Sequence, residues 1–308
     1  MARRKKGRPI TGWLVVDKPL KMTSTQVVTR IRNLYNPQKI GHGGTLDPLA
    51  SGLLPIAMGE ATKTVPYVMD GAKKYRMTLC WGQSTATDDR EGEIVEVSDA
   101  RPTREAIEKA LPAFVGEIEQ VPPVFSAIKV EGRRAYDLAR RHEEFELKPR
   151  LVEITELTLL SCPSRDEAVL EVSCGKGTYM RALARDLGRA LGTPAHVSAL
   201  RRLKVGPFTE SDAISLDYLE SLGHSPAALE QLLPLKTALD GIPVLVLSEA
   251  EANRLRLGQP VSVMALSFRE RIGGLAGGDT VFVMTGDKPV ALTRYEKGEI
   301  HPVRVLNM

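Results

Sequence analysis

One carboxylate, Asp47, stands alone in the stretch GHGGTLDPLASG (residues 41–52), and the nearest acids in the sequence are Asp17 and Glu60. General acid–base catalysis usually employs two carboxylates whose environments separate their pKa values, so this stretch indicates another use of a single acid. Gly41, Gly43 and Gly44 can clear space for a large planar ligand, and Pro48 favours an extended backbone at Asp47. The composition of the loop alone instead favours an ordinary turn that Asp47 caps.

His42 precedes this acid and offers a general base or a ring that stacks on a nucleobase, although residue type alone favours a hydrogen-bonded loop histidine. None of the five histidines stands at metal-ligand spacing from another. The stretch matches neither the phosphate-binding P-loop nor the dinucleotide-binding glycine motif, and the chain lacks a Gly-x-Ser-x-Gly nucleophile motif. The acidic run DDREGE (88–93) could bind a cation, but a hydrated hairpin turn is the favoured interpretation.

Arg181 lies in GTYMRALARDLGRALG (177–192), where leucines and arginines each recur at helical spacing. If Thr178 caps this helix, Arg181 falls in the first turn, where the helix dipole disfavours a cation. A carboxylate from elsewhere in the fold would explain that position. The alternative is an ordinary surface arginine.

The bulk composition is that of a globular protein, with 308 residues, 43% hydrophobic and 26% charged. This length suggests one large or two ordinary domains. No apolar run approaches the roughly 18 residues of a membrane span, and the basic start of the chain lacks the apolar segment of a signal peptide. Three widely spaced cysteines predict reduced thiols, a cytoplasmic protein and no zinc site.

Basic residues are clustered rather than in excess. Five of the 42 lysines and arginines lie in residues 1–8, which leaves 37 basic against 38 acidic residues, close to neutral. Clusters recur at KKYR (73–76), GRRAYDLARR (132–141) and LRRLK (200–204). Such clusters attract phosphate backbones, and the aromatic residues among them can stack on bases. Solvated faces of helices and strands explain the pattern equally well.

Periodicity predicts the elements that position these residues. Residues 12–19 and 53–58 read as strands, and Tyr75 to Trp81 alternate as a half-buried strand does. Helices are predicted at 22–35, with a capping box of Thr23 and Gln26, and at 102–116, closed by Gly116. Strands and helices mix without a regular βαβ alternation, which favours an α+β fold. After about residue 220, glycine-rich turns separate short apolar strands, so a small β-rich domain is expected at 236–308.

Several segments together resemble one family, the bacterial TruB-type tRNA pseudouridine synthases, which isomerise the uridine at position 55 in the tRNA T-loop. The resemblance runs from about residue 12 to 220 and rests on VVDKPLKMTS (15–24), KIGHGGTLDPLASGLLPIAMGEATK (39–63), KKYRMTLCWGQSTATDDREGEI (73–94), VPPVFSAIKVEGRRAYDLAR (121–140), VSCGKGTYMRALARDLG (172–188) and LRRLKVGPF (200–208). More weakly, the C-terminal part resembles the small PUA-type RNA-binding domain.

The resemblance implies a pseudouridine synthase fold: a mixed, mostly antiparallel central sheet with flanking helices, followed by the β-rich PUA-like domain. It divides the chain into a basic flexible tail (1–8), a catalytic domain (9–235) with an RNA-binding insertion at about 124–152, and the PUA-like domain (236–308). The partner is the T-stem-loop of tRNA. We expect a cytoplasmic monomer with no membrane association and no obligatory protein partner.

The resemblance also assigns the site. Asp47 matches the sole catalytic acid, Arg181 its ion-pair partner, and Tyr75 the ring that stacks on the target base. The remaining matches are His42, which accommodates the nucleotide, Tyr179 of the KGTY-x-R element, Leu200 in the uracil pocket and Lys18 as structural support. Phosphate contacts are expected from the basic residues of the insertion and of LRRLK, namely Lys129, Arg133, Arg134, Arg140, Arg141, Arg201, Arg202 and Lys204.

Two positions depart from the family pattern, which has glycine at Lys21 and threonine at Gly43. Neither residue supplies a reacting group, so we expect them to affect the loop conformation and not the activity.

The implied reaction breaks the bond between ribose C1′ and uracil N1 and joins C1′ to C5, so its stoichiometry requires no redox cofactor or metal. The uridine must leave the T-loop stack, at a cost of a few kcal/mol, and stacking on Tyr75 recovers roughly 1–3 kcal/mol. Arg181 offsets the desolvation of an ionised Asp47, which acts as a nucleophile at C1′ or as a base at C2′. Tyr75 is a candidate to assist removal of the C5 proton.

Two other functions use the same features. The chain could be a tRNA-binding and folding chaperone without catalysis, or the catalytic subunit of a guide-dependent pseudouridylase, which would need partner proteins and a guide RNA.

Overall fold

The computed structural model describes residues 7–126, 128–130, 132–141, 143–264 and 274–308. In this part of the chain, ten strands form one sheet in the order β14-β1-β3-β12-β4-β11-β10-β7, with β2 beside β3 and β13 beside β12. The strands are β1 (Gly12–Lys18), β2 (Ile40–His42), β3 (Ala50–Met58), β4 (Lys73–Trp81), β7 (Gly116–Gln120), β10 (Arg150–Ser164), β11 (Glu167–Cys174), β12 (Ala195–Val205), β13 (Phe208–Thr209) and β14 (Ala213–Ser215). Only the β1–β14 and β3–β12 pairs among them are parallel, so the predicted mixed, mostly antiparallel sheet is confirmed.

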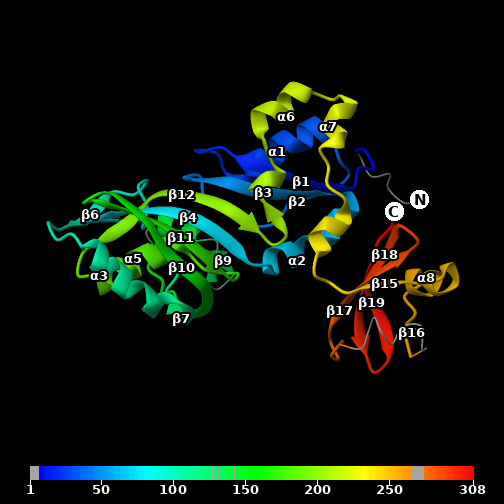
Figure 1. Cartoon of the computed structure of the whole chain (residues 1–308). Coiled ribbons are helices and arrows are strands. Elements are labelled where there is room, and N and C mark those ends of the chain that lie inside the picture. The colour runs from blue at the N-terminus through cyan, green and yellow to red at the C-terminus, as the bar shows by residue number, and fades with distance from the viewer. Residues whose placement is uncertain (1–6, 127, 131, 142, 265–273) are drawn as a thin grey trace.

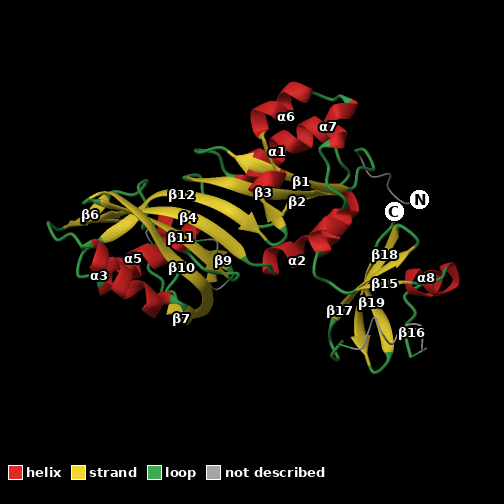
Figure 2. Cartoon of the chain, viewed as in Figure 1, coloured by secondary structure: helices red, strands yellow, loops and turns green. Residues whose placement is uncertain are grey.

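Two separate groups of helices pack against this sheet (Figures 1 and 2). One group comprises α1 (Ser24–Tyr35), α6 (Leu216–Leu222) and α7 (Pro226–Glu230), and the other comprises α3 (Arg104–Ala110), the 3₁₀ helix η2 (Leu111–Phe114) and α5 (Met180–Ala190). The 3₁₀ helix η1 (Gly59–Thr64) and α2 (Val65–Asp70) follow β3, and η3 (Glu210–Asp212) follows β13.

The core beneath α5 comes from the alternation of β4. Met77, Leu79 and Trp81 are at most 1% exposed and pack in one cluster with Leu183 and Leu187 of α5. Burial of each such side chain stabilises the fold by about 1.5–3 kcal/mol. The predicted strand face is therefore confirmed, and it fixes α5 against the middle of the sheet.

The N-terminal helix forms as predicted. The Thr23 side chain accepts from the Gln26 amide, and the Gln26 side chain accepts in return from the Thr23 amide, which completes the capping box. The helix predicted at 102–116 is shorter, since α3 gives way to η2 at Leu111 and Pro112 provides no amide hydrogen to continue the α-helical pattern. Gly116, with φ of +101°, begins β7.

Two hairpins lie outside the main sheet. The first pairs β5 (Gln83–Thr85) with β6 (Ile94–Val97), and the second pairs β8 (Lys129–Val130) with β9 (Arg133–Arg134), which leads into α4 (Ala135–Arg140). The second hairpin and α4 belong to the predicted insertion at 124–152, of which residues 127, 131 and 142 lie outside the described residues, as do residues 1–6 of the predicted tail.

The predicted C-terminal β-rich domain is confirmed, and it lies to one side of the large sheet (Figure 1). Within the described residues, its sheet has the order β15-β17-β18-β19-β16. Its elements are β15 (Val244–Val246), α8 (Glu249–Arg256), β16 (Val261–Ser262), β17 (Thr280–Thr285), β18 (Lys288–Glu296) and β19 (Glu299–Val305), preceded by the 3₁₀ helix η4 (Leu235–Leu239). Phe282, Leu292 and Leu306 share a buried cluster with Trp13 and Phe208 of the large domain, so the two parts are packed together by apolar contacts.

Candidate active site

A cavity of about 600 Å³ opens where the 43–49 loop meets the start of α5. It brings together five of the predicted catalytic and nucleotide-binding residues, Asp47, Tyr75, Tyr179, Arg181 and Leu200, from four separate parts of the chain. Its other lining residues are Thr23, Thr45, Leu46, Pro48, Thr87, Asp89, Glu91, Phe125, Ser126, Tyr136, Arg140, Thr178 and Met180. The combination of aromatic rings with charged side chains fits a planar, polar ligand.

The charged centre is an ion pair between Asp47 and Arg181, with 2.9 Å between Asp47 Oδ2 and Arg181 Nη2. The Asp47 side chain remains 38% exposed, whereas that of Arg181 is only 7% exposed. The cation is therefore held in the protein while the carboxylate reaches the cavity. The pairing that the sequence resemblance implied is present in the geometry, and the alternative of a surface arginine is wrong.

Arg181 holds a second carboxylate, that of Asp89, at 3.4 Å from Nη1. Its guanidinium also donates to the backbone oxygens of Thr87 (3.2 Å) and Phe125 (3.0 Å). The other oxygen of Asp89 accepts from the Thr87 hydroxyl at 2.6 Å and from the Glu91 amide at 3.0 Å. These bonds fix the orientation of the guanidinium, so Asp47 meets a cation that is already in place.

The acidic run at 88–93 forms the predicted hairpin turn between β5 and β6, and Arg90, Glu91 and Glu93 are exposed. The prediction of hydration is wrong for the two aspartates, since Asp89 is 3% exposed and Asp88 pairs with Arg185 of α5 at 3.0 Å. Burial raises the pKa of Asp88, against the lowering effect of Arg185. The hairpin loop is therefore docked on α5 by two aspartate–arginine pairs one helical turn apart.

The start of α5 also differs from the prediction, because Tyr179 and not Thr178 is the N-cap residue. The Tyr179 amide donates to Gln120 Oε1 at 2.9 Å, and Gln120 Nε2 donates back to the Tyr179 carbonyl at 3.2 Å. Gln120, on β7, is 1% exposed. A side chain 59 positions away in sequence thus replaces the usual local cap and sets the position of Tyr179 at the cavity.

The loop that carries Asp47 is anchored by buried polar side chains. The Ser24 hydroxyl accepts from the Leu46 amide at 2.8 Å and lies 3.1 Å from the Leu46 oxygen, to which it donates. Lys18 is fully buried and donates to the oxygens of Pro19 (2.9 Å), Met22 (2.7 Å) and, more weakly, Pro48 (3.4 Å). Burial lowers the Lys18 pKa to about 8. Its predicted role as structural support agrees with this geometry.

Tyr75 and Leu200 face the cavity from adjacent strands of the sheet, β4 and β12. Burial raises the pKa of Tyr75, and burial likewise raises that of Tyr179. Both phenols therefore stay protonated at neutral pH and can serve as hydrogen-bond donors and as flat apolar surfaces.

His42 does not line this cavity. It lies on β2 opposite Ile56, where its Nδ1 accepts from the Gly44 amide at 3.3 Å. Burial lowers the pKa of His42, so the ring is neutral at pH 7. Its observed contact supports the turn before Asp47, and its predicted contact with a nucleotide stays a prediction.

The glycines of the loop have different surroundings. A Cβ at Gly43 would lie 2.8 Å from Val68 Cγ1, whereas a Cβ at Gly41 would have nothing within 4 Å. Gly44 and Gly52 have φ of +126° and +97°, a region that glycine occupies without strain. The expectation that Gly41, Gly43 and Gly44 clear space for a ligand is therefore wrong for Gly43.

The residues predicted to bind phosphate fall into different environments. Arg202 is 2% exposed and hydrogen-bonded to backbone, so it presents no surface to RNA. The prediction that it binds phosphate is wrong. Arg201 pairs with Asp17 and Glu210, and Arg133 pairs with Glu143. Those exposed at the surface are Lys129, Arg133, Arg134, Arg140, Arg141 and Lys204, of which Arg140 also lines the cavity and lies 5.7 Å from the Tyr136 ring centre.

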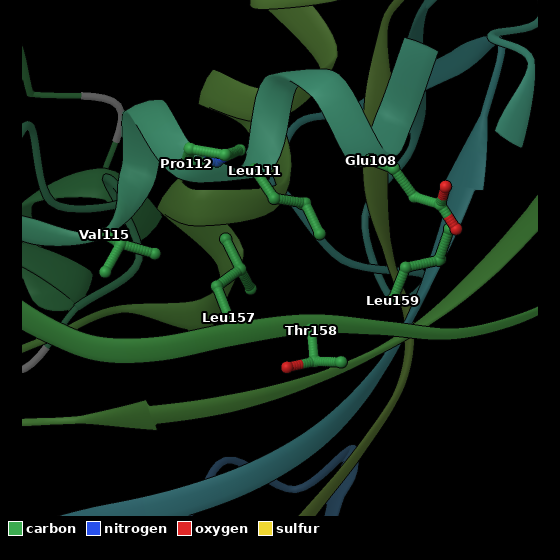
Figure 3. A pocket seen from close by; sticks show the side chains of 7 residues that line it. All are labelled: Glu108, Leu111, Pro112, Val115, Leu157, Thr158 and Leu159. Carbon is green, nitrogen blue, oxygen red and sulfur yellow. The ribbon is translucent and has the colours of Figure 1, made fainter. Parts of the chain in front are cut away.

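A second cavity, of about 530 Å³, lies between α3 with η2 and strand β10 (Figure 3). It is lined mostly by apolar side chains, including Leu111, Val115 and Leu157. Its one titratable residue, Glu108, already accepts from Arg104 at 2.8 Å. It shares no residue with the Asp47 cavity, and its residue types offer no chemistry.

Within the described residues, no cluster of histidine, cysteine and acidic side chains could hold a metal ion, and no helix is long and apolar enough to span a membrane.

The fold is shared with solved structures. One, titled a Cbf5-Nop10-Gar1 complex, aligns with a TM-score of 0.74 at 26% identity, over 96% of this chain and 85% of that one. Another, of an H/ACA RNP bound to a substrate RNA containing 2′-deoxyuridine, aligns with a TM-score of 0.73 at 24% identity, over 100% and 92%. The chain thus has the fold of the Cbf5 class of pseudouridine synthases.

Sequence relatives narrow the class. The TruB family pseudouridylate synthase (N terminal domain) matches residues 32–180, and the tRNA pseudouridylate synthase B C-terminal domain matches residues 181–240. A protein from Rhodospirillum rubrum named tRNA pseudouridine synthase B is 55% identical, and one of the same name from Caulobacter vibrioides is 53% identical, each over 100% of both chains. The chain belongs to the TruB family of pseudouridylate synthases.

Proposed function

We propose that this protein converts the uridine at position 55 in the T-loop of tRNA to pseudouridine. The observation that carries the proposal is the Asp47–Arg181 pair, which presents one partly exposed carboxylate in a cavity lined by tyrosines. The full-length relatives named tRNA pseudouridine synthase B support tRNA as the substrate.

The reaction adds no atoms to the RNA and removes none overall. One carboxylate that acts on the sugar is therefore sufficient. The C1′–N1 bond breaks, the uracil rotates within the cavity, a C1′–C5 bond forms, and the C5 proton leaves while N1 gains one. Asp47 acts on the sugar, either as a nucleophile at C1′ or as a base at C2′, and the buried guanidinium of Arg181 stabilises its carboxylate form. Tyr75 lines the same cavity, so its ring can stack on the flipped base and its phenol can assist proton transfer at C5.

Affinity for RNA comes from exposed basic side chains of the insertion and of β12. Arg140 of the insertion lies at the cavity itself, and Lys204 of β12 is exposed without lining the cavity. Phosphate contacts of this kind attract any RNA, whereas the cavity selects the flipped nucleotide. The domain division at residue 235, the PUA-like role of the C-terminal sheet, the cytoplasmic location and the monomeric state belong to the same proposal.

The test uses the purified chain alone with an unmodified T-stem-loop as substrate. Formation of pseudouridine at position 55, detected by site-specific chemical mapping, supports a stand-alone tRNA enzyme. A requirement for added protein or guide RNA would instead indicate a guide-dependent catalytic subunit. Restored tRNA folding without any pseudouridine would indicate a chaperone.

A further inference from the structure

Arg202 has an unusual environment for an arginine in a basic segment. Its guanidinium donates to backbone oxygens through three nitrogens, from Nη2 to Gly44 at 3.1 Å, from Nη1 to Thr45 at 3.2 Å and from Nε to Leu53 at 2.8 Å. A buried charge is costly unless hydrogen bonds compensate it, and here the carbonyls of the Asp47 loop and of β3 supply that compensation.

Gly52 permits this approach. It lies on β3 and pairs with Arg202 in the parallel β3–β12 register, where any Cβ would clash with the Arg202 backbone. At Gly44 a Cβ would lie 3.6 Å from Arg202 Nη1, an ordinary contact, so glycine is favoured there by its φ of +126° and not by the approach of Arg202. The glycine at position 52 is thus explained by its contact with Arg202.

Arg202 also lies opposite the tyrosine of the cavity. In the antiparallel β4–β12 register its Cα partner is Tyr75, and its charge acts to lower the Tyr75 pKa against the effect of burial. One side chain therefore connects the backbone two and three residues before Asp47 to the strand that carries Tyr75.

We propose that Arg202 is a positioning residue that sets the distance between Asp47 and Tyr75 by clamping the loop at Gly44 and Thr45 to strands β3 and β12. The inference rests on the proposed function. Ser24 and Lys18 anchor the loop at Leu46 and Pro48. On the first half of the loop, the Gly43 and Gly44 amides bond to Pro55 and His42, and Arg202 holds the carbonyls of Gly44 and Thr45. A lysine would keep the charge but lose the planar fork that reaches separate carbonyls.

The experiment compares Arg202→Met and Arg202→Lys with the unaltered chain. A T-stem-loop tritiated at uridine C5 is mixed with saturating excess enzyme, and the single-turnover rate of tritium release is measured. Dissociation constants for the same RNA are measured at several salt concentrations. Displacement of a catalytic group by about 1 Å can cost up to a hundredfold in rate. We expect Arg202→Met to lower the rate constant at least tenfold and Arg202→Lys to restore part of it. Affinity and its salt dependence should change less than twofold.

Two matched variants give the comparison. Arg104→Met removes an exposed arginine of α3 that pairs with Glu108, and neither residue lines the Asp47 cavity. This change should leave the rate constant unchanged. Lys204→Gln removes an exposed cation of β12 and should weaken affinity and reduce its salt dependence, the behaviour expected of a phosphate contact. Because excess enzyme saturates the RNA, a partly unfolded preparation would still show the wild-type rate constant. A lowered rate constant therefore reports the geometry of the folded site.

An Arg202→Met or Arg202→Lys protein with weaker, less salt-dependent binding and a normal saturated rate, as expected if Arg202 only contacts phosphate, would overturn the inference. So would a normal rate together with normal binding. If Arg202→Met does not fold, Arg202→Lys alone decides, since a normal rate in that variant excludes a need for the fork. Inactivity of the unaltered chain would contradict the proposed function instead, which keeps the two failures apart.

Discussion

Replacement of Arg181 by methionine should lower stability through the loss of the Asp89 pair and lower activity through the loss of the Asp47 pair. At an effective dielectric constant of about 20, the 3.4 Å contact with Asp89 corresponds to about 5 kcal/mol of attraction before desolvation. The Asp89 side chain is 4% exposed, so water cannot replace the lost cation. Asp47 is 38% exposed and is largely hydrated after the change. We expect a loss of about 3–5 kcal/mol in unfolding free energy, the usual result of leaving a buried charge unpaired.

The double variant Arg181→Met with Asp89→Asn separates the two effects. An amide at position 89 carries no charge, and its oxygen can still accept from Thr87 and Glu91. We therefore expect about half of the lost stability to return, while tritium release stays absent because Asp47 still lacks its cation. Urea unfolding at 25 °C measures the first effect, and single-turnover tritium release measures the second.

Two results would refute this reasoning. A loss below 1 kcal/mol in the single variant would show that Asp89 does not depend on Arg181 for its burial. Recovery of activity in the double variant would show that Arg181 acts only through folding. Asp89→Asn alone, with Arg181 intact, serves as the control for the amide itself.

Three further outcomes follow from the loop and its surroundings. Above about pH 8, Lys18 loses a proton and a donor to the Asp47 loop, so the single-turnover rate should fall, and Lys18→Arg should move that fall to higher pH. Because the pKa of Lys18 in the folded protein lies below the ordinary 10.5, the unfolded chain binds more protons than the folded protein between about pH 8 and 10.5. The free energy of unfolding should therefore rise with pH across this range, and a falling melting temperature would contradict this. Lys21→Gly should raise stability by about 0.5 kcal/mol in urea unfolding, since Lys21 has φ of +64°, and a decrease would show that its side chain stabilises the turn. Affinity for the T-stem-loop should fall steeply with salt, and Lys204→Gln should reduce that slope by about one, whereas an unchanged slope would exclude a phosphate contact there.

Local signals predicted the elements that depend on local physics. The alternation of β4 and the capping box at Thr23 involve neighbours in sequence, and both are confirmed. The start of α5 could not be predicted in this way, because its orphan amide is satisfied by Gln120 from a different strand. The early end of the helix predicted at 102–116 could have been predicted from Pro112. The helical spacing of Ile107 and Leu111 favoured a longer helix instead.

The site was less accessible to sequence reasoning. Asp89 looked like a hydrated acid because its partner Arg181 lies far away in sequence. The nearby Thr87 hydroxyl, which also bonds to it, does not by itself indicate burial. Arg202 looked like a phosphate contact because it stands in the basic segment LRRLK with Arg201 and Lys204. Its burial comes from pairing of β12 with β3 and β4 and from the Asp47 loop, all distant in sequence. The resemblance brought the Asp47 and Arg181 pair together before any geometry, but it did not provide the groups that hold the pair in place.

The central claim is that a single carboxylate, Asp47, performs the isomerisation. Its most direct test is tritium release from a T-stem-loop tritiated at C5 of uridine 55, with the unaltered chain and Asp47→Asn compared at saturating enzyme. The amide is nearly isosteric but cannot act as a nucleophile or a base. We predict one tritium released per RNA by the unaltered chain and none above background by Asp47→Asn. Release by Asp47→Asn at the wild-type rate would contradict the account.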